Sequence, residues 1–268
     1  MRNRVRIGVF VLATLAVVAF FGCFALTKER EDPTALAEKE NILGDFVWVL
    51  KNDQWRLVAI ITFALLVAIA MKGAAMPYYV EYYLGSAKMI SVFLTSGMLA
   101  GIGGAMFANW LSARTCKVRV MKWAALGIVV FHFAVIFVQP GQLWLALALL
   151  TLANFCHMIV IPYLFSAVPD TVDYGLQRWD KGAMAMSFSG HLLALKIGIA
   201  VGGALTGWIL AFVGYQPNAE QTSGALYGII FNLAGSQVLA GLLVLVCLAF
   251  YRLNREWAEQ HATSQLTT

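Results

Sequence analysis

The sequence predicts an all-α membrane protein with about seven transmembrane spans. Its 268 residues are 60% hydrophobic and only 12% charged, whereas soluble domains average about 25% charged residues. Several apolar runs reach twenty or so residues, the length that a helix needs to cross a bilayer. The basic residues behind the formal charge of +5 lie in short segments between these runs. This pattern is typical of loops that orient spans, not of nucleic-acid binding.

The first apolar run, residues 7–26, follows the basic start MRNRVR. A basic start before an apolar run also occurs in signal peptides. Here, however, the run is about twenty residues long and leads into the charged segment TKERED, without a cleavage site of small residues. We therefore predict that residues 1–26 form a retained transmembrane helix.

Residues 27–55 are the most charged stretch, and we predict a cytoplasmic loop there. Within it, one helical face collects the apolar side chains of Ile42, Leu43, Phe46, Val47 and Leu50. Such a face is typical of an amphipathic helix lying on the membrane surface. An ordinary solvated helix would show the same pattern, so both interpretations stay open.

Residues 56–251 predict a six-helix bundle, and residues 252–268 a polar cytoplasmic tail. The expected spans cover residues 56–83, 90–111, 123–138, 143–165, 184–213 and 226–251. Glycines at about four-residue spacing in the second and fifth of these spans predict close helix contacts. Pro162 is expected near the end of its span, before an aspartate-rich turn at 170–175.

Several polar residues fall inside these spans. Lys72 lies near the tyrosine-rich segment 78–83, which is typical of a membrane–water interface. Its amine either reaches that interface or lines a cavity. Four others are interpreted as ties between helices: Asn109, His132, Asn232 and Gln237.

Lys196 is the most informative residue of the sequence. It lies 15 residues after Lys181, about 22 Å along a helix, and so deep inside a bilayer core of about 30 Å. A lysine there costs roughly 2.5–3.5 kcal/mol on insertion scales and should face a protein interior or a wet cavity. In these six spans the only acid is Glu81, near an interface, so no counter-charge within the chain is evident.

The distribution of basic residues predicts the orientation. With seven spans, most lysines and arginines fall on one side, and only Arg2, Arg4, Arg6 and Lys88 fall on the other. The positive-inside rule assigns the basic side, with the C-terminus, to the cytoplasm. The same rule disfavours three arginines outside, so we predict that Met1 is not the natural start of the fold.

The sequence does not predict an enzyme, a catalytic residue or a metal site. Its histidines and aspartates do not cluster at ligand spacing, and it has neither a Glu-x-x-His nor a Gly-x-Ser-x-Gly motif. The cysteines Cys23, Cys116, Cys156 and Cys247 are far apart and lack Cys-x-x-Cys spacing. We expect free thiols.

Several segments together resemble one known family. They are DTVDYG at 170–175 with Lys196 after it, GWILAFVGYQPNAEQ at 207–221, FALTKERED at 24–32, KNDQW at 51–55 and YYVEYYLG at 78–85. They resemble the glycoside–pentoside–hexuronide:cation symporters, the melibiose permease-like group of the major facilitator superfamily. The resemblance covers essentially the whole chain and is most specific over residues 170–221.

That family has twelve spans, and this chain resembles the last seven: the sixth helix and the C-terminal six-helix bundle. The resemblance implies a multi-pass protein of the inner (plasma) membrane that carries a sugar or glycoside between two six-helix halves. It implies no cofactor. The main ligands of the coupling Na⁺ or H⁺ belong to the first five helices, which are absent here. Besides the lipid bilayer, the implied partner is therefore the missing N-terminal half or a chain that replaces it.

Site residues follow from the resemblance position by position. Lys196 matches a lysine that lines the sugar and cation cavity. Independently of the resemblance, three polar residues inside the spans are further cavity candidates, with interhelical hydrogen bonds as the alternative: His191, Asn154 and His157. His191 lies about 140° around the helix from Lys196, so both cannot face the cavity centre.

A second set matches the family's cytoplasmic gate, whose charged groups pair across the two halves. It comprises Asp170, Asp173 and Tyr174, with Arg178 as a basic substitute. Leu176, Gly182 and Met184 stand where the family has charged residues, which puts the carried-over ion pairs in doubt. Ile161 stands where melibiose permease has an aromatic that stacks on sugar, so galactoside specificity is not supported.

The leading hypothesis is the C-terminal portion of a secondary active sugar:cation symporter, truncated and unable to transport alone. The alternative is a non-transporting interaction or regulatory membrane protein. It would dock on an intact carrier through the polar surface around Lys196.

Overall fold

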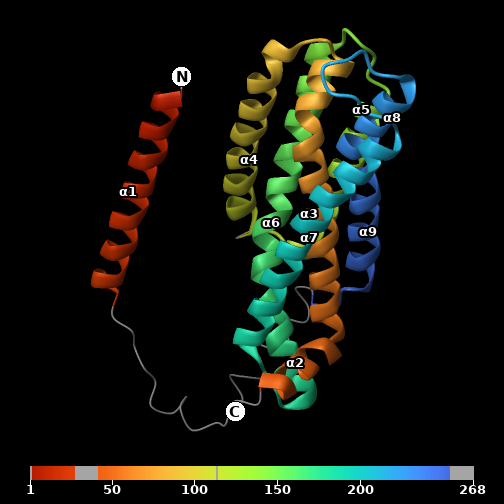
Figure 1. The fold of residues 1–268 in the computed structure, drawn as a ribbon. Coiled ribbons are helices and arrows are strands. Elements are labelled where there is room, and N and C mark those ends of the chain that lie inside the picture. Colours follow the sequence, from red (N-terminus) through yellow and green to blue (C-terminus); the bar gives the residue numbers. More distant parts are fainter. Residues whose placement is uncertain (1, 28–41, 113, 254–268) are drawn as a thin grey trace. The chain divides into compact units, whose positions relative to one another are not determined.

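A computed structural model describes residues 2–27, 42–112 and 114–253 (Figure 1). Within these ranges every regular element is a helix. Seven helical segments are long and apolar enough to cross a membrane. The prediction of an all-α membrane protein with about seven spans is confirmed.

Helix α1 (Arg2–Leu26) belongs to one compact unit, and residues from Ile42 onward form a second. Its 25 residues form one uninterrupted helix, about 37 Å long at 1.5 Å per residue. That length suits a transmembrane span. Most of the predicted central loop, residues 28–41, lies outside the described residues.

Helix α2 (Ile42–Lys51) is where the sequence predicts an amphipathic helix. It packs on the bundle through Val49, which is only 5% exposed, and through the Trp48 ring, 6.4 Å from that of Trp179. Its other apolar side chains, Phe46, Val47 and Leu50, stay exposed. A membrane-surface position for that open face remains a prediction.

The bundle begins with α3 (Asp53–Tyr78), whose first turn is capped by Asn52. The Asn52 Oδ1 accepts hydrogen bonds from the backbone N–H groups of Gln54 and Trp55, both at 3.1 Å. These bonds satisfy two of the donors that a helix start leaves free. The Asn52 Nδ2 also donates to the Thr171 carbonyl at 2.6 Å, which fixes the start of α3 to a distant part of the chain.

The remaining elements follow in chain order. They are the π-turn η2 (Tyr79–Tyr83), the 3₁₀ turn η3 (Ala87–Met89), α4 (Ile90–Ser112), α5 (Lys117–Ile136), α6 (Leu143–Trp179), α7 (Met184–Phe212), α8 (Ser223–Ile230), the π-turn η4 (Phe231–Gly235) and α9 (Ser236–Phe250). The segments α8, η4 and α9 together form the last span.

The aspartate-rich turn predicted at 170–175 is wrong, because α6 continues through it to Trp179. Pro162 and Pro169 both lie inside this helix. Proline removes one backbone hydrogen bond, but the helix continues because Thr171, Val172 and Tyr174 bury one of its faces. The chain turns at Asp180, which adopts the left-handed conformation with φ 54°.

Within the bundle, α3 packs against α7 and α9, α6 packs against α4 and α5, and α5 packs against α9 (Figure 1). Glycines make two of these contacts close. A Cβ added at Gly198 would lie 2.8 Å from the Phe63 carbonyl of α3, and one at Gly101 would lie 3.0 Å from the Met158 side chain of α6. The predicted close approach at the glycines is confirmed at these positions.

The bundle interior contains two apolar clusters, one toward each end. Ile61 and Ile128 belong to one cluster, and Leu150 and Leu233 to the other. Helices α3, α5 and α6 and the last span each contribute to both clusters. On these four segments, polar residues lie in the chain between the two apolar sets.

Candidate functional site

These intervening residues form what we call the polar layer: Lys72 of α3, His132 of α5, Asn154 and His157 of α6, and Gln237 of α9. Four members are 5% exposed or less, and Asn154 is partly buried. Polar groups at membrane depth are costly unless they find partners. Their placement together is therefore the first candidate site.

Lys72 is the charged member of the polar layer. Its Nζ donates a hydrogen bond of 2.6 Å to Asn154 Oδ1, and its side chain is 5% exposed. The interpretation that its amine reaches the interface is therefore wrong. Among the residues that the structure describes, no carboxylate forms an ion pair with Lys72.

The two histidines of the polar layer have defined tautomers. The Nδ1 atoms lie 2.9 Å from the Ile128 carbonyl for His132 and 3.2 Å from the Ala153 carbonyl for His157. A carbonyl can only accept, so in each neutral ring Nδ1 carries the hydrogen and Nε2 is an acceptor. Neither Nε2 has a partner within the described residues. The ring centroids are 5.5 Å apart in an edge-on arrangement.

Gln237 and Asn154 connect the layer to neighbouring backbones. Gln237 Nε2 donates to the Ala68 carbonyl, which confirms the predicted tie between helices, here α9 and α3. Asn154 lies against Gly97 of α4, where an added Cβ would be 2.5 Å from the amide nitrogen. The polar layer thus combines the ammonium of Lys72 with neutral acceptors on facing helices. Because Lys72 lies on α3 and its acceptor Asn154 on α6, loss of this hydrogen bond would affect both helices.

Lys196 and His191 lie on different sides of α7. His191 is fully buried, with Nδ1 3.3 Å from the Thr62 hydroxyl of α3 and its ring 4.9 Å from that of Phe165. Lys196 is exposed on the bundle. Within the described residues its side chain has neither an ion pair nor a hydrogen-bond partner.

Small residues accompany Lys196 along α7. Ser189, Ala200, Gly203 and Gly207 are all exposed and share its side of the helix by spacing. A Cβ added at Gly203 or Gly207 would meet nothing within 4 Å. Leu192 and Ile199 are exposed on the same side, so small and aliphatic residues surround one charge in the middle of a span.

The predicted gate residues gather on the last turns of α6. Tyr174 is buried, and its hydroxyl accepts a hydrogen bond of 2.8 Å from Arg178. Asp170 pairs with Lys117 of α5 at 2.6 Å, a partner that the sequence reasoning missed. Asp173 and Arg178 stay exposed. Burial, and then the charge of Asp170, raise the pKa of Tyr251 above its ordinary value.

The structure brings together Asn154 and His157 but places Lys196 and His191 elsewhere. The polar layer as a unit was not predicted from the sequence, where Lys72, His132 and Gln237 were assessed separately. The sequence does contain a pattern that indicates this layer, because Lys72, His132 and Gln237 each lie between two apolar segments of a span.

Comparison with known proteins extends these observations. Residues 1–255 match the family described as MFS/sugar transport protein. The inner membrane symporter YicJ of Escherichia coli K12 is 33% identical over 228 residues, which cover 84% of this chain and 49% of that protein. The putative glycoside/cation symporter YagG of the same organism is 31% identical over 211 residues, 78% of this chain and 45% of YagG.

The isoprimeverose transporter of Lactiplantibacillus pentosus is 25% identical over 253 residues, 91% of this chain and 51% of that protein. The chain thus spans about half the length of the curated relatives it matches.

Proposed function

Because this chain belongs to the MFS/sugar transport family, we propose that it is the C-terminal half of a sugar:cation symporter. The family consists of transporters, so the chain is not an enzyme. In carriers with this architecture, two six-helix halves rock around a site near the middle of the membrane. The bundle of α3 to α9 would be one half, and it would not transport without the other.

Lys196 carries this proposal. A charged side chain at mid-span is stable in a membrane only when it faces protein or a wet cavity. Lys196 is exposed on the bundle, beside the small residues of α7. A second half would cover this side of α7. The Lys196 ammonium could then bind a carboxylate of that half or the hydroxyl groups of a sugar between the halves.

Asn154 and His157 are proposed to contribute to the cavity indirectly, as members of the polar layer that hold the helices of the bundle in place. His191 is proposed to fix α7 against α3, since its Nδ1 lies 3.3 Å from Thr62. Asp173 and Arg178 are exposed on the bundle, and in the proposed gate they would pair with the second half. Tyr174 and Asp170 would hold that end of α6 through Arg178 and Lys117.

The names of the relatives support a glycoside or sugar as substrate and a cation as the coupling ion. We propose that this cation is Na⁺ or H⁺. YicJ supports an inner membrane location. The distribution of basic residues supports a cytoplasmic C-terminus.

Uptake of radiolabelled glycosides by cells tests the proposal. Cells with this chain alone should show background uptake, and cells that also express the part of YicJ that matches the family's first five helices should show cation-dependent uptake. Lys196→Leu should lower that uptake at least tenfold, because the cavity loses its charge. The control Lys88→Gln changes an exposed lysine in η3 and should leave uptake unchanged. Robust uptake by the chain alone would refute the need for a second half.

The second candidate is a regulatory protein that docks on an intact carrier through the Lys196 side of α7. The same exposed lysine favours it, because docking would also cover the charge. Co-purification with full-length YicJ, lost on Lys196→Leu and retained in Lys88→Gln, would support docking. The absence of uptake with a supplied half would then favour docking over transport.

A further inference from the structure

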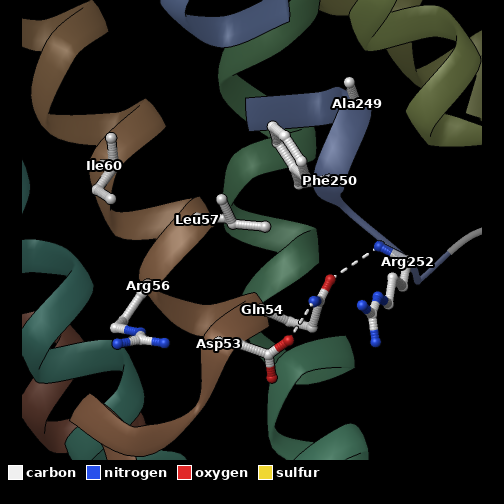
Figure 2. A pocket seen from close by; sticks show the side chains of 8 residues that line it. All are labelled: Asp53, Gln54, Arg56, Leu57, Ile60, Ala249, Phe250 and Arg252. Atoms are coloured by element: carbon white, nitrogen blue, oxygen red, sulfur yellow. Dashed lines mark hydrogen bonds between the residues drawn. The ribbon is translucent and has the colours of Figure 1, made fainter. Parts of the chain in front are cut away.

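A cavity of about 640 Å³ lies between the start of α3 and the end of α9, on a part of the bundle that the proposed function does not use (Figure 2). Its lining residues are Asp53, Gln54, Arg56, Leu57, Ile60, Ala249, Phe250 and Arg252. The arginines lie at the end of the bundle that the sequence assigns to the cytoplasmic side. The cavity therefore opens where a lipid headgroup would lie.

The two arginines of this cavity are available for a ligand. Arg56 and Arg252 are exposed, and neither forms an ion pair with a carboxylate of the described residues. The acid of the cavity, Asp53, is engaged separately. Its Oδ2 accepts a hydrogen bond of 2.8 Å from the neutral amide of Gln54. Neither guanidinium forms an ion pair with Asp53, and two arginines with one aspartate give the cavity a formal net charge of +1.

A hydrogen bond between the first turn of α3 and the segment after α9 fixes one part of the cavity lining. The backbone N–H of Arg252 donates to Gln54 Oε1 at 2.8 Å, as Figure 2 shows. Gln54 is only 1% exposed. This bond holds the start of the extended segment after α9 against the first turn of α3, so Arg252 has a defined position beside the cavity.

The rest of the lining is apolar and lies toward the membrane centre. Ile60 is one helical turn beyond Arg56 and is 45% exposed, and Phe250 is 68% exposed. Figure 2 shows both on the side of the cavity away from the Arg252 guanidinium. Charge at one end and exposed hydrocarbon at the other is the distribution of a phospholipid, not of a soluble anion.

We propose that this cavity binds an anionic phospholipid, with its phosphate at Arg56 and Arg252 and an acyl chain along Ile60 and Phe250. Guanidinium groups bind phosphate through paired, charge-assisted hydrogen bonds. A net negative headgroup matches the net positive charge of this cavity better than a zwitterionic one does. Basic residues near a membrane surface strengthen the binding of anionic lipids.

Native mass spectrometry of the purified chain tests the proposal, with phosphatidylglycerol and phosphatidylethanolamine of equal chain length added in turn. The wild-type chain should retain phosphatidylglycerol preferentially. The double variant Arg56→Gln/Arg252→Gln should weaken that retention by roughly tenfold or more. The matched double variant Arg119→Gln/Lys122→Gln removes two exposed cations from the first turns of α5 and should retain the lipid as the wild type does.

Competition with inorganic phosphate distinguishes a phospholipid headgroup from a free phosphate ion as the occupant of the cavity. If a lipid is the occupant, millimolar phosphate should not displace phosphatidylglycerol, and Phe250→Ser should weaken retention although both arginines remain. Displacement by phosphate would overturn the lipid assignment. Equal retention of the two lipids, or equal losses in the two double variants, would overturn the site. Matching unfolding midpoints for all variants exclude misfolding as the cause.

Discussion

Replacing Asn154 by leucine should lower the free energy of unfolding by roughly 1.5–3 kcal/mol. The reason is the buried ammonium of Lys72, whose Nζ donates to Asn154 Oδ1 at 2.6 Å. Leucine is similar in shape to asparagine but offers no acceptor. The charge would then remain 5% exposed without this partner. Denaturant titration of the purified chain in detergent micelles, followed by circular dichroism, measures the change.

Removing the charge itself should have a different result. Lys72→Met keeps the length of the side chain and should destabilise less than Asn154→Leu does, because only the neutral, partly buried Asn154 Oδ1 then lacks its donor. The double variant Lys72→Met/Asn154→Leu should recover most of the stability lost in Asn154→Leu. If Lys72→Met alone destabilises as much as Asn154→Leu, the ammonium is needed for packing and this account of the polar layer is wrong.

Gly202→Ala should destabilise the bundle by about 1–3 kcal/mol. A Cβ at this position would overlap the Val67 carbonyl of α3, and backbone cannot rotate away as a side chain can. Helices α3 and α7 would have to separate along their whole contact. The melting temperature of the purified chain should fall, and crosslinking between cysteines introduced on α3 and α7 should slow.

The next residue supplies the matched control. Gly203 also lies in α7, but a Cβ there would meet nothing within 4 Å. Gly203→Ala should therefore stabilise the chain by about 0.5–1 kcal/mol, the ordinary gain of alanine over glycine inside a helix. In α4, Gly104 faces the Phe155 carbonyl, whereas Gly103 has only an ordinary contact of 3.7 Å with the Phe155 ring. Alanine at Gly104 should therefore destabilise the chain more than alanine at Gly103. Equal effects of alanine at Gly202 and Gly203, or at Gly104 and Gly103, would contradict the packing argument.

The spans could be predicted because each depends on local chain properties. A helix must satisfy its backbone internally to cross a bilayer, so apolar length alone indicates where α3, α4 and α5 lie. Glycine spacing likewise predicted close helix contacts. It did not predict their faces: Gly198 packs against α3, while Gly203 and Gly207 remain open.

The errors concern residues whose role depends on neighbours. Charged Asp170 and Asp173 were interpreted as a turn, yet α6 continues because the buried faces of Thr171 and Tyr174 stabilise it. Lys72 was interpreted from its distance to the tyrosines, whereas its position follows from an acceptor in α6, Asn154. Asp170 pairs with Lys117 and Lys72 with Asn154, and both partners are distant in sequence, so local patterns carry no information about either pairing.

The sequence by itself determined that this chain is a bundle of membrane spans with basic loops and a mid-span lysine, since these features require only composition, length and spacing. Tertiary structure alone decided which charge is buried and which is exposed. Lys72 meets Asn154 inside the bundle, whereas Lys196 lies on its exposed side. The physical reason is that the free energy of a charge in a membrane depends on the acceptors around it, and packing brings those acceptors from other helices.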